Sequence, residues 1–177
     1  NGHTISSAFA KTDNSNNSVI GIQGVTNTVT LSNLIIEGKD GVNLHGVNAY
    51  VSNAVLNDVT IRNNDNTAIN INGSEVVVNN LKTSGHKASL SFGIIDLATG
   101  SGVTRSPKLT VNGRSEHAES GNFHIKRLSG TVIDTNSQYN GPTNTLFWGY
   151  RYTLKSAPAV PTISSPAESQ EITTTST

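Results

Sequence analysis

Histidine and carboxylate side chains are the residues of this sequence that could bind a metal ion or transfer protons. The five histidines show no spacing that is typical of metal ligands on one helix or strand. They are His3, His45, His86, His117 and His124. His45 follows Leu44 in a strand pattern, and we expect its side chain to point outward. The sequence therefore predicts no metal site and no cofactor.

The aspartates recur at no common spacing. They are Asp13, Asp40, Asp58, Asp65, Asp96 and Asp134. A calcium site needs about six oxygen ligands, and glycoside hydrolysis needs two neighbouring carboxyl groups. The closest acidic pair, Glu116 and Glu119, flanks His117 in a segment that we expect to be a solvated loop, although acid–base chemistry by this trio is an alternative. We predict no catalytic residue, and a non-enzyme is favoured over an enzyme.

One aromatic cluster is present, between Phe147 and Tyr152. Strand alternation would place Trp148, Tyr150 and Tyr152 on one face, where aromatic rings could stack on sugars. These three residues are the predicted ligand-binding residues. The alternative interpretation is structural, in that the cluster would cover the open end of a hydrophobic core. A lateral face of Asn, Thr and Ser is the other candidate surface for polysaccharide, with no individual residues selected.

The composition excludes several partner classes. The 177 residues carry 12 basic and 12 acidic side chains, so there is no basic face for nucleic acid. No run of about 18 apolar residues is present, which predicts no membrane insertion. The chain has no cysteine, whereas Asn, Ser and Thr number 22, 21 and 21. These polar residues favour turns and strands over helices.

Two short patterns repeat along the chain. The first is an apolar alternation after Asn or Asp, and aligning Leu34, Val59, Leu81 and Leu109 gives spacings of 25, 22 and 28 residues. The second is a small residue followed by apolar residues, at Gly21-Ile22, Gly41-Val42, Ala68-Ile69 and Gly93-Ile94. Both patterns alternate with period two, which indicates strands, and no helical pattern separates them.

A repeat of 20 to 28 residues made only of strands is typical of one coil of a parallel β-helix. The predicted fold class is therefore all-β, a right-handed parallel β-helix, in which Leu34, Val59 and Leu81 stack in one column. Asn33, Asp58 and Asn80 share one repeat position. We expect them to form turns in the left-handed region and to hydrogen-bond along the axis.

Two parts of the chain are distinguished by composition. Residues 1–155 form the predicted β-helix domain, which we expect to lack N-terminal coils because the sequence opens in what reads as mid-domain. Residues 156–177 are rich in Ser, Thr and Pro and are predicted to be a disordered linker.

The repeated segments Leu31–Ile36 and Leu56–Ile61, together with the closing region 102–119 and 132–139, resemble the pectate-lyase-like adhesive domain of bacterial surface proteins. This resemblance implies an extracellular location at the cell wall or surface and a binding role. We expect a non-catalytic, monomeric adhesion module that recognises a polysaccharide or a host glycoprotein. Alternatives are a fragment of a polysaccharide lyase or hydrolase and a structural spacer. Arg105-Ser106-Pro107 resembles a lyase arginine motif, but Thr110 stands where a second arginine would be.

Overall fold

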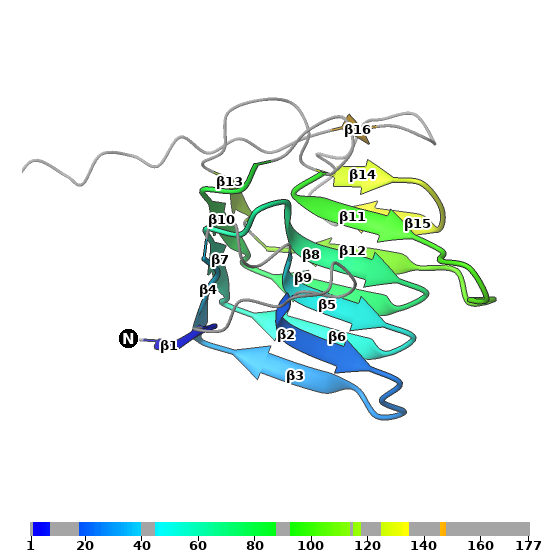
Figure 1. Cartoon of the computed structure of the whole chain (residues 1–177), viewed down its shortest axis with the longest axis horizontal. Coiled ribbons are helices and arrows are strands. Elements are labelled where there is room, and N and C mark those ends of the chain that lie inside the picture. Colours follow the sequence, from blue (N-terminus) through cyan, green and yellow to red (C-terminus); the bar gives the residue numbers. More distant parts are fainter. Residues whose placement is uncertain are drawn as a thin grey trace, which may run out of the picture.

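The computed structural model describes residues 2–7, 18–39, 45–87, 93–113, 115–117, 125–134 and 146–147. The described residues form sixteen strands and no helix. The strands belong to three sheets, here named A, B and C, and the chain visits A, B and C in turn. Figure 1 shows the resulting stack of coils. The parallel β-helix predicted from the sequence is confirmed.

Each sheet takes one strand from every coil, and all pairs are parallel except the last one in sheet B. Sheet A contains β1 (His3–Ser6), β4 (Leu34–Glu37), β7 (Thr60–Arg62), β10 (Lys82–Ser84) and β13 (Glu116–His117). Sheet B contains β2 (Ser18–Gln23), β5 (His45–Tyr50), β8 (Thr67–Asn72), β11 (Ile95–Ala98), β14 (Ile125–Arg127) and β16 (Leu146–Phe147). Sheet C contains β3 (Val29–Ser32), β6 (Asn53–Asn57), β9 (Glu75–Asn79), β12 (Lys108–Asn112) and β15 (Thr131–Asp134).

The first sequence pattern predicted the core correctly through three coils. In sheet A, Ile35 pairs with Thr60 and Thr60 with Lys82, so the residues just before them stack as well. These are Leu34, Val59 and Leu81, which all belong to or pack against the hydrophobic core. Apolar columns of this kind remove side chains from water in every coil and are the main source of stability in a solenoid.

The fourth copy of that pattern was assigned wrongly. Leu109 lies in sheet C, where it pairs with Val76 of β9, and not in the column of Leu81. The residue that follows Leu81 in that column is the buried Ser115, because Lys82 pairs with Glu116. The segment between β11 and β12 is longer than its counterparts in the other coils, and this extra length shifts the spacing on which the alignment depended.

The second pattern identified strands of sheet B but misjudged their register. Gly21 pairs with Asn48, and Asn48 pairs with Asn70, so Gly21 is two positions away from Ala68. Residues 41–44 lie outside the described residues. Register in a buried sheet is determined by which side chains enter the core, and small residues next to a core position do not mark it uniquely.

Residues with positive φ lie at the corners of the coil. Between sheets C and A they are Asn33, Asp58 and Asn80, with φ of 54°, 51° and 57°. This confirms the predicted turn position. The corner between sheets B and C uses Gly24, Val51 and Gly73 in the same way. Asparagine and aspartate adopt this region more readily than other residues with a side chain, which explains the residue types at the corner between sheets C and A.

Candidate binding groove

The corner between sheets C and A, here named the C–A corner, carries side chains that are hydrogen-bonded along the solenoid axis. Asn80 donates from Nδ2 to Asp58 Oδ1 at 3.0 Å, as the shared repeat position predicted. In the next coil Gly113 takes the left-handed conformation, with φ of 66°. A Cβ atom at Gly113 would collide with Asn80 Oδ1, so a larger residue there would force the Asn80 side chain to move. The corner is therefore a row of left-handed turns, one in each coil.

A second row of amides lies directly beside the first. Asn57 donates to Ser32 Oγ at 3.2 Å, Asn79 donates to Asn57 Oδ1 at 2.6 Å, and Asn112 donates to Asn79 Oδ1 at 2.9 Å. Each link joins one coil to the next, because these residues pair in register in sheet C. Two neighbouring rows of polar side chains thus run parallel to the axis.

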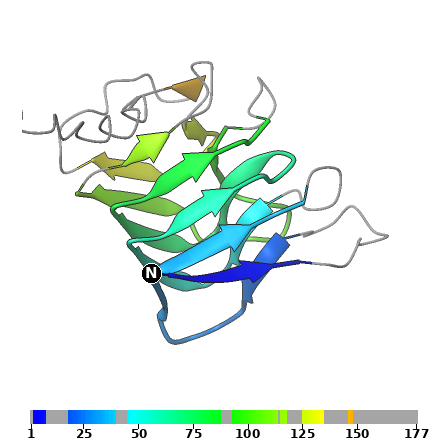
Figure 2. The same cartoon turned by 90° about the vertical axis from the view of Figure 1, so that its left-hand side faces the viewer.

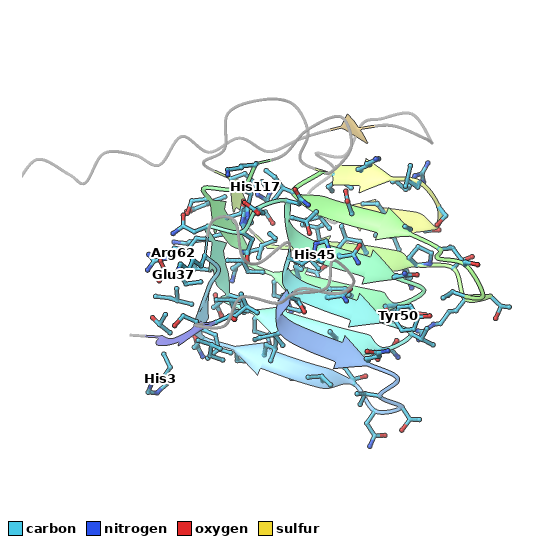
Figure 3. All side chains as sticks on the ribbon, in the orientation of Figure 1. His3, Glu37, His45, Tyr50, Arg62 and His117 are labelled. Carbon is cyan, nitrogen blue, oxygen red and sulfur yellow. The ribbon has the colours of Figure 1, made fainter. Side chains whose placement is uncertain are left out.

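The outer face of sheet A continues this polar surface. Figure 2 views the molecule from the side on which sheet A lies. In-register neighbours form ion pairs: Arg62 with Glu37 at 2.9 Å and Lys82 with Glu116 at 3.4 Å. Glu37 and Arg62 project outward together in Figure 3. The Arg62 guanidinium lowers the pKa of the Glu37 carboxyl.

Between the C–A corner and sheet A lies a groove of about 260 Å³ that spans two coils. It is lined by Asp58 and Asn80 of the C–A corner and by Thr60 and Lys82 of sheet A. The groove therefore offers a carboxylate, an amide, a hydroxyl and an ammonium group, a set of donors and acceptors suited to a ligand rich in hydroxyl groups. It contains one carboxylate, whereas acid–base hydrolysis of a glycosidic bond needs two.

Sequence reasoning did not predict this groove. Asp58 and Asn80 were interpreted as turn residues only, and Thr60 and Lys82 were not selected at all. The signal was present in the repeat, since Thr60 follows Asp58 by two residues just as Lys82 follows Asn80. The groove can be recognised only from the strand register, which places Lys82 beside Thr60 in sheet A.

The acidic trio of the sequence analysis is divided by the structure. The predicted loop is wrong for Glu116 and His117, which form the strand β13. Alternation along that strand separates them: Glu116 contacts Lys82, while His117 is buried and its Nδ1 lies 2.7 Å from Thr83 Oγ1. Glu119 lies outside the described residues. No group of three or more His, Asp or Glu side chains that could hold a metal ion is found in the described part.

Asp96 in sheet B is a buried carboxyl group with a raised pKa. It is 9% exposed and accepts a hydrogen bond from Gly93 N at 2.6 Å. Burial raises the pKa of Asp96 to about 7, although the Gly93 N–H and the Lys126 charge oppose this. Asp96 continues a column that contains Asn48, Asn70 and Lys126. Asn70 donates to Asn48 at 2.9 Å.

Arg105 of the suspected lyase motif has a structural role. Its guanidinium donates to Asn53 Oδ1 and lies 3.4 Å from Glu75 Oε1. Glu75 and Asn53 belong to β9 and β6, so the loop between β11 and β12 is tied to two successive coils.

The sequence predicted that the His45 side chain points outward. This prediction is wrong, because His45 is buried. It is 9% exposed, and its Nδ1 lies 2.5 Å from Thr67 Oγ1 of the next coil. Figure 3 labels it on sheet B. His86 is also buried, accepts a hydrogen bond from Asn64 N and contacts the Ile61 carbonyl at 3.0 Å. Burial lowers the pKa of each to about 4.

The predicted ligand-binding residues Trp148, Tyr150 and Tyr152 lie outside the described residues, as does the linker 156–177. The alternative role as a cap concerns the same segment. Immediately before it, β16 pairs antiparallel with β14 of the last coil through Phe147 and Ile125. Figure 1 places β16 over that end of the solenoid.

No protein-family model, no curated protein and no solved structure matches this chain. Among the described residues no helix is long and apolar enough to cross a membrane. The fold and the groove are thus the findings on which a functional proposal must be based.

Proposed function

We propose that this chain is a non-catalytic binding module of an extracellular bacterial surface protein, and that it recognises a polysaccharide or a host glycan. The observation that carries the proposal is the groove of Asp58, Thr60, Asn80 and Lys82. Its four side chains offer both donors and acceptors to sugar hydroxyls, and only one of them is a carboxylate.

The groove is held in shape before any ligand arrives. Asn80 and Asp58 are joined by a hydrogen bond, and Thr60 and Lys82 are fixed as neighbours by the register of β7 and β10. A preformed site loses little conformational entropy on binding, which favours useful affinity from few contacts. Because the groove spans two coils, an extended glycan lying along the axis would contact both.

The proposed location depends on the resemblance of the repeated strands and closing region to the pectate-lyase-like adhesive domain. A cysteine-free, neutral, Asn-, Ser- and Thr-rich chain is compatible with that location. The β-helix fold agrees with the resemblance but is shared by proteins of many functions, so the site and not the fold must be tested.

The experiment is a glycan array followed by calorimetry with the full chain. Lys82→Ala and Thr60→Val each remove one polar group from the groove, and Thr60→Val keeps the β-branched shape. We expect each to weaken binding at least several-fold. Arg62→Ala is the control, because Arg62 lies on the same sheet but does not line the groove. Binding that is unaffected by both groove variants would reject this site, and an array without any signal would favour the spacer.

A polysaccharide lyase or hydrolase is the second candidate, and Asp96 is the observation that favours it. A buried carboxyl with a pKa of about 7 can hold a proton at neutral pH and release it, as a general acid does. Incubation with uronic-acid polymers, followed by detection of unsaturated or reducing-end products, tests this candidate. Product formed by the wild type and lost in Asp96→Asn would replace the binding proposal with an enzymatic one.

A further inference from the structure

The outer face of sheet C carries a column of β-branched side chains. Within β6, β9 and β12 buried residues alternate with more exposed ones, so every second side chain points away from the core. The strands of sheet C lie one above another (Figure 1), and their outward residues are neighbours in register. The column consists of Thr30, Val55, Val77, Thr110 and Ile133. Thr30 and Ile133 are exposed, and the three residues between them are half-buried.

The two flanks of this column determine which ligand it suits. On one side lies the hydrogen-bonded row of Ser32, Asn57, Asn79 and Asn112, here named the amide row, which contains no charged group. On the other side the charges compensate one another, because Glu75 lies 3.4 Å from Arg105 and 4.0 Å from Lys108. Strand preference accounts for the β-branched residues of the column but not for the uncharged row beside it. The centre of the face is therefore apolar and neutral.

The amide row retains hydrogen-bonding capacity toward solvent. A side-chain amide has two N–H groups and an oxygen with two lone pairs. In the row, Asn57 and Asn79 each donate one N–H to the preceding coil and accept one hydrogen bond from the following coil. Among the described residues, no partner takes the second N–H or the second lone pair of either amide. The row thus offers a donor and an acceptor in successive coils, at the strand spacing of about 4.8 Å.

We propose that the outer face of sheet C binds a neutral, linear polysaccharide that lies along the solenoid axis, an inference that rests on the proposed function. The sugars of an extended, β-linked chain have apolar C–H faces and carry hydroxyl groups at their edges. Their faces would cover Val55 and Val77, which removes apolar surface from water, and their hydroxyls would bond to the amide row. One sugar unit is close in length to the coil spacing, so successive units would meet equivalent side chains. The groove borders the other side of the amide row, because Asp58 follows Asn57, and the two surfaces are continuous.

Calorimetry of the full chain with neutral gluco-, xylo- and manno-oligosaccharides of graded length tests the proposal, and uronic-acid oligosaccharides of equal length are the charged comparison. We expect the affinity for a neutral series to rise with each added unit, because each unit reaches one further coil, and to exceed that for the charged series. Val77→Arg places a long charged side chain in the middle of the column and should weaken binding many-fold. Leu128→Arg is the matched control, because Leu128 is 57% exposed and follows β14 of sheet B. The control is expected to bind as the wild type does.

Circular dichroism establishes that each variant is folded. If Val77→Arg does not fold, Thr110→Arg tests the same column one coil further along. A folded column variant that binds like the wild type overturns this inference, as does a preference for the charged series. In either case the groove proposal stands if Lys82→Ala still weakens binding. If no glycan binds at all, the proposed function and this inference both fail.

Discussion

Two corners of the same coil differ in the side chains that surround their turns. The C–A corner turns through single residues in the left-handed region, Asn33, Asp58 and Asn80, and its side chains are hydrogen-bonded near the surface. The corner between sheets A and B, here named the A–B corner, is longer and is built around the buried His45 and His86. Left-handed residues turn the chain at both corners, since Asn63 and Gly85 also have positive φ, but the A–B corner depends in addition on buried histidines that contact the neighbouring coil.

The comparison shows why one corner is readable from sequence. A turn that needs positive φ favours Asn, Asp or Gly, so the residue type marks such positions, with Val51 as the exception in the described residues. A histidine buried against a threonine one coil away has no such local mark. His45 therefore looked like an ordinary outward-facing strand residue, and only the folded A–B corner shows that it is buried.

The largest expected effect is the response of the A–B corner to acid. The pKa values of His45 and His86 are lowered to about 4, so between pH 6.5 and 4 the unfolded chain binds protons that the folded chain does not. The contribution of the two neutral histidines to the free energy of unfolding should be fully present above pH 6.5. It should fall as the pH decreases, by on the order of 3 kcal/mol for each histidine. Urea unfolding of Asp96→Asn at pH 7.5 and 4.5 measures this loss, because the variant lacks the carboxyl group that titrates in the opposite sense.

Asp96 changes the free energy of unfolding with pH in the opposite direction, over almost the same pH range. Its pKa is raised from 3.8 to about 7, so its stabilising contribution is present at low pH and is lost as the pH rises through 7. Asp96→Asn removes this compensation, and acid should then destabilise the variant more than the wild type. Equal acid sensitivity of the two proteins would show that Asp96 does not offset the histidines.

The second effect tests the C–A corner through its backbone. Asp58→Val places a β-branched residue at φ of 51° and also removes the acceptor for Asn80, so we expect a loss of about 2 kcal/mol. Asp58→Asn is the control, because asparagine tolerates the same conformation. Chemical denaturation measures both variants. Similar stability of the valine and asparagine variants would mean that residue type does not form this corner.

A third prediction extends the comparison to the corner between sheets B and C. Val51 has φ of 47°, while Gly24 and Gly73 hold the corresponding positions in the coils on either side. Val51→Gly should relieve the strain and raise the free energy of unfolding by about 1 kcal/mol, after allowance for the greater flexibility of glycine in the unfolded chain. Thermal unfolding would contradict this expectation if the variant melted at a lower temperature than the wild type.

The smallest expected effect concerns the outer side of the A–B corner. Arg62 and Glu37 form an ion pair there, but their side chains are 39% and 31% exposed. Arg62→Ala should therefore cost only about 0.5 kcal/mol, and the cost should shrink in high salt. If this variant were as damaging as acid, surface charge and not the buried histidines would hold the corner.

The core and the C–A corner were predictable because each coil repeats them at nearly the same spacing. Leu34, Val59 and Leu81 were aligned correctly, whereas Leu109 was not, since the loop before β12 adds residues that the pattern does not reveal. The groove needs Asp58 and Lys82 from different coils, so its existence depends on register and not on any contiguous motif. Asp96 was also missed, because no pattern in the sequence marks its burial.

The shared register at the C–A corner also has a consequence for how such a chain changes in length. Asn57 and Asn79 occupy equivalent positions, as do Asp58 and Asn80. Excision of residues 58–79 would join Asn57 directly to Asn80 and bring Ala54 and Leu56 of β6 against Leu109 and Val111 of β12. A gene encoding this fold can thus lose or duplicate a 22-residue unit while apolar residues still meet apolar residues across the junction.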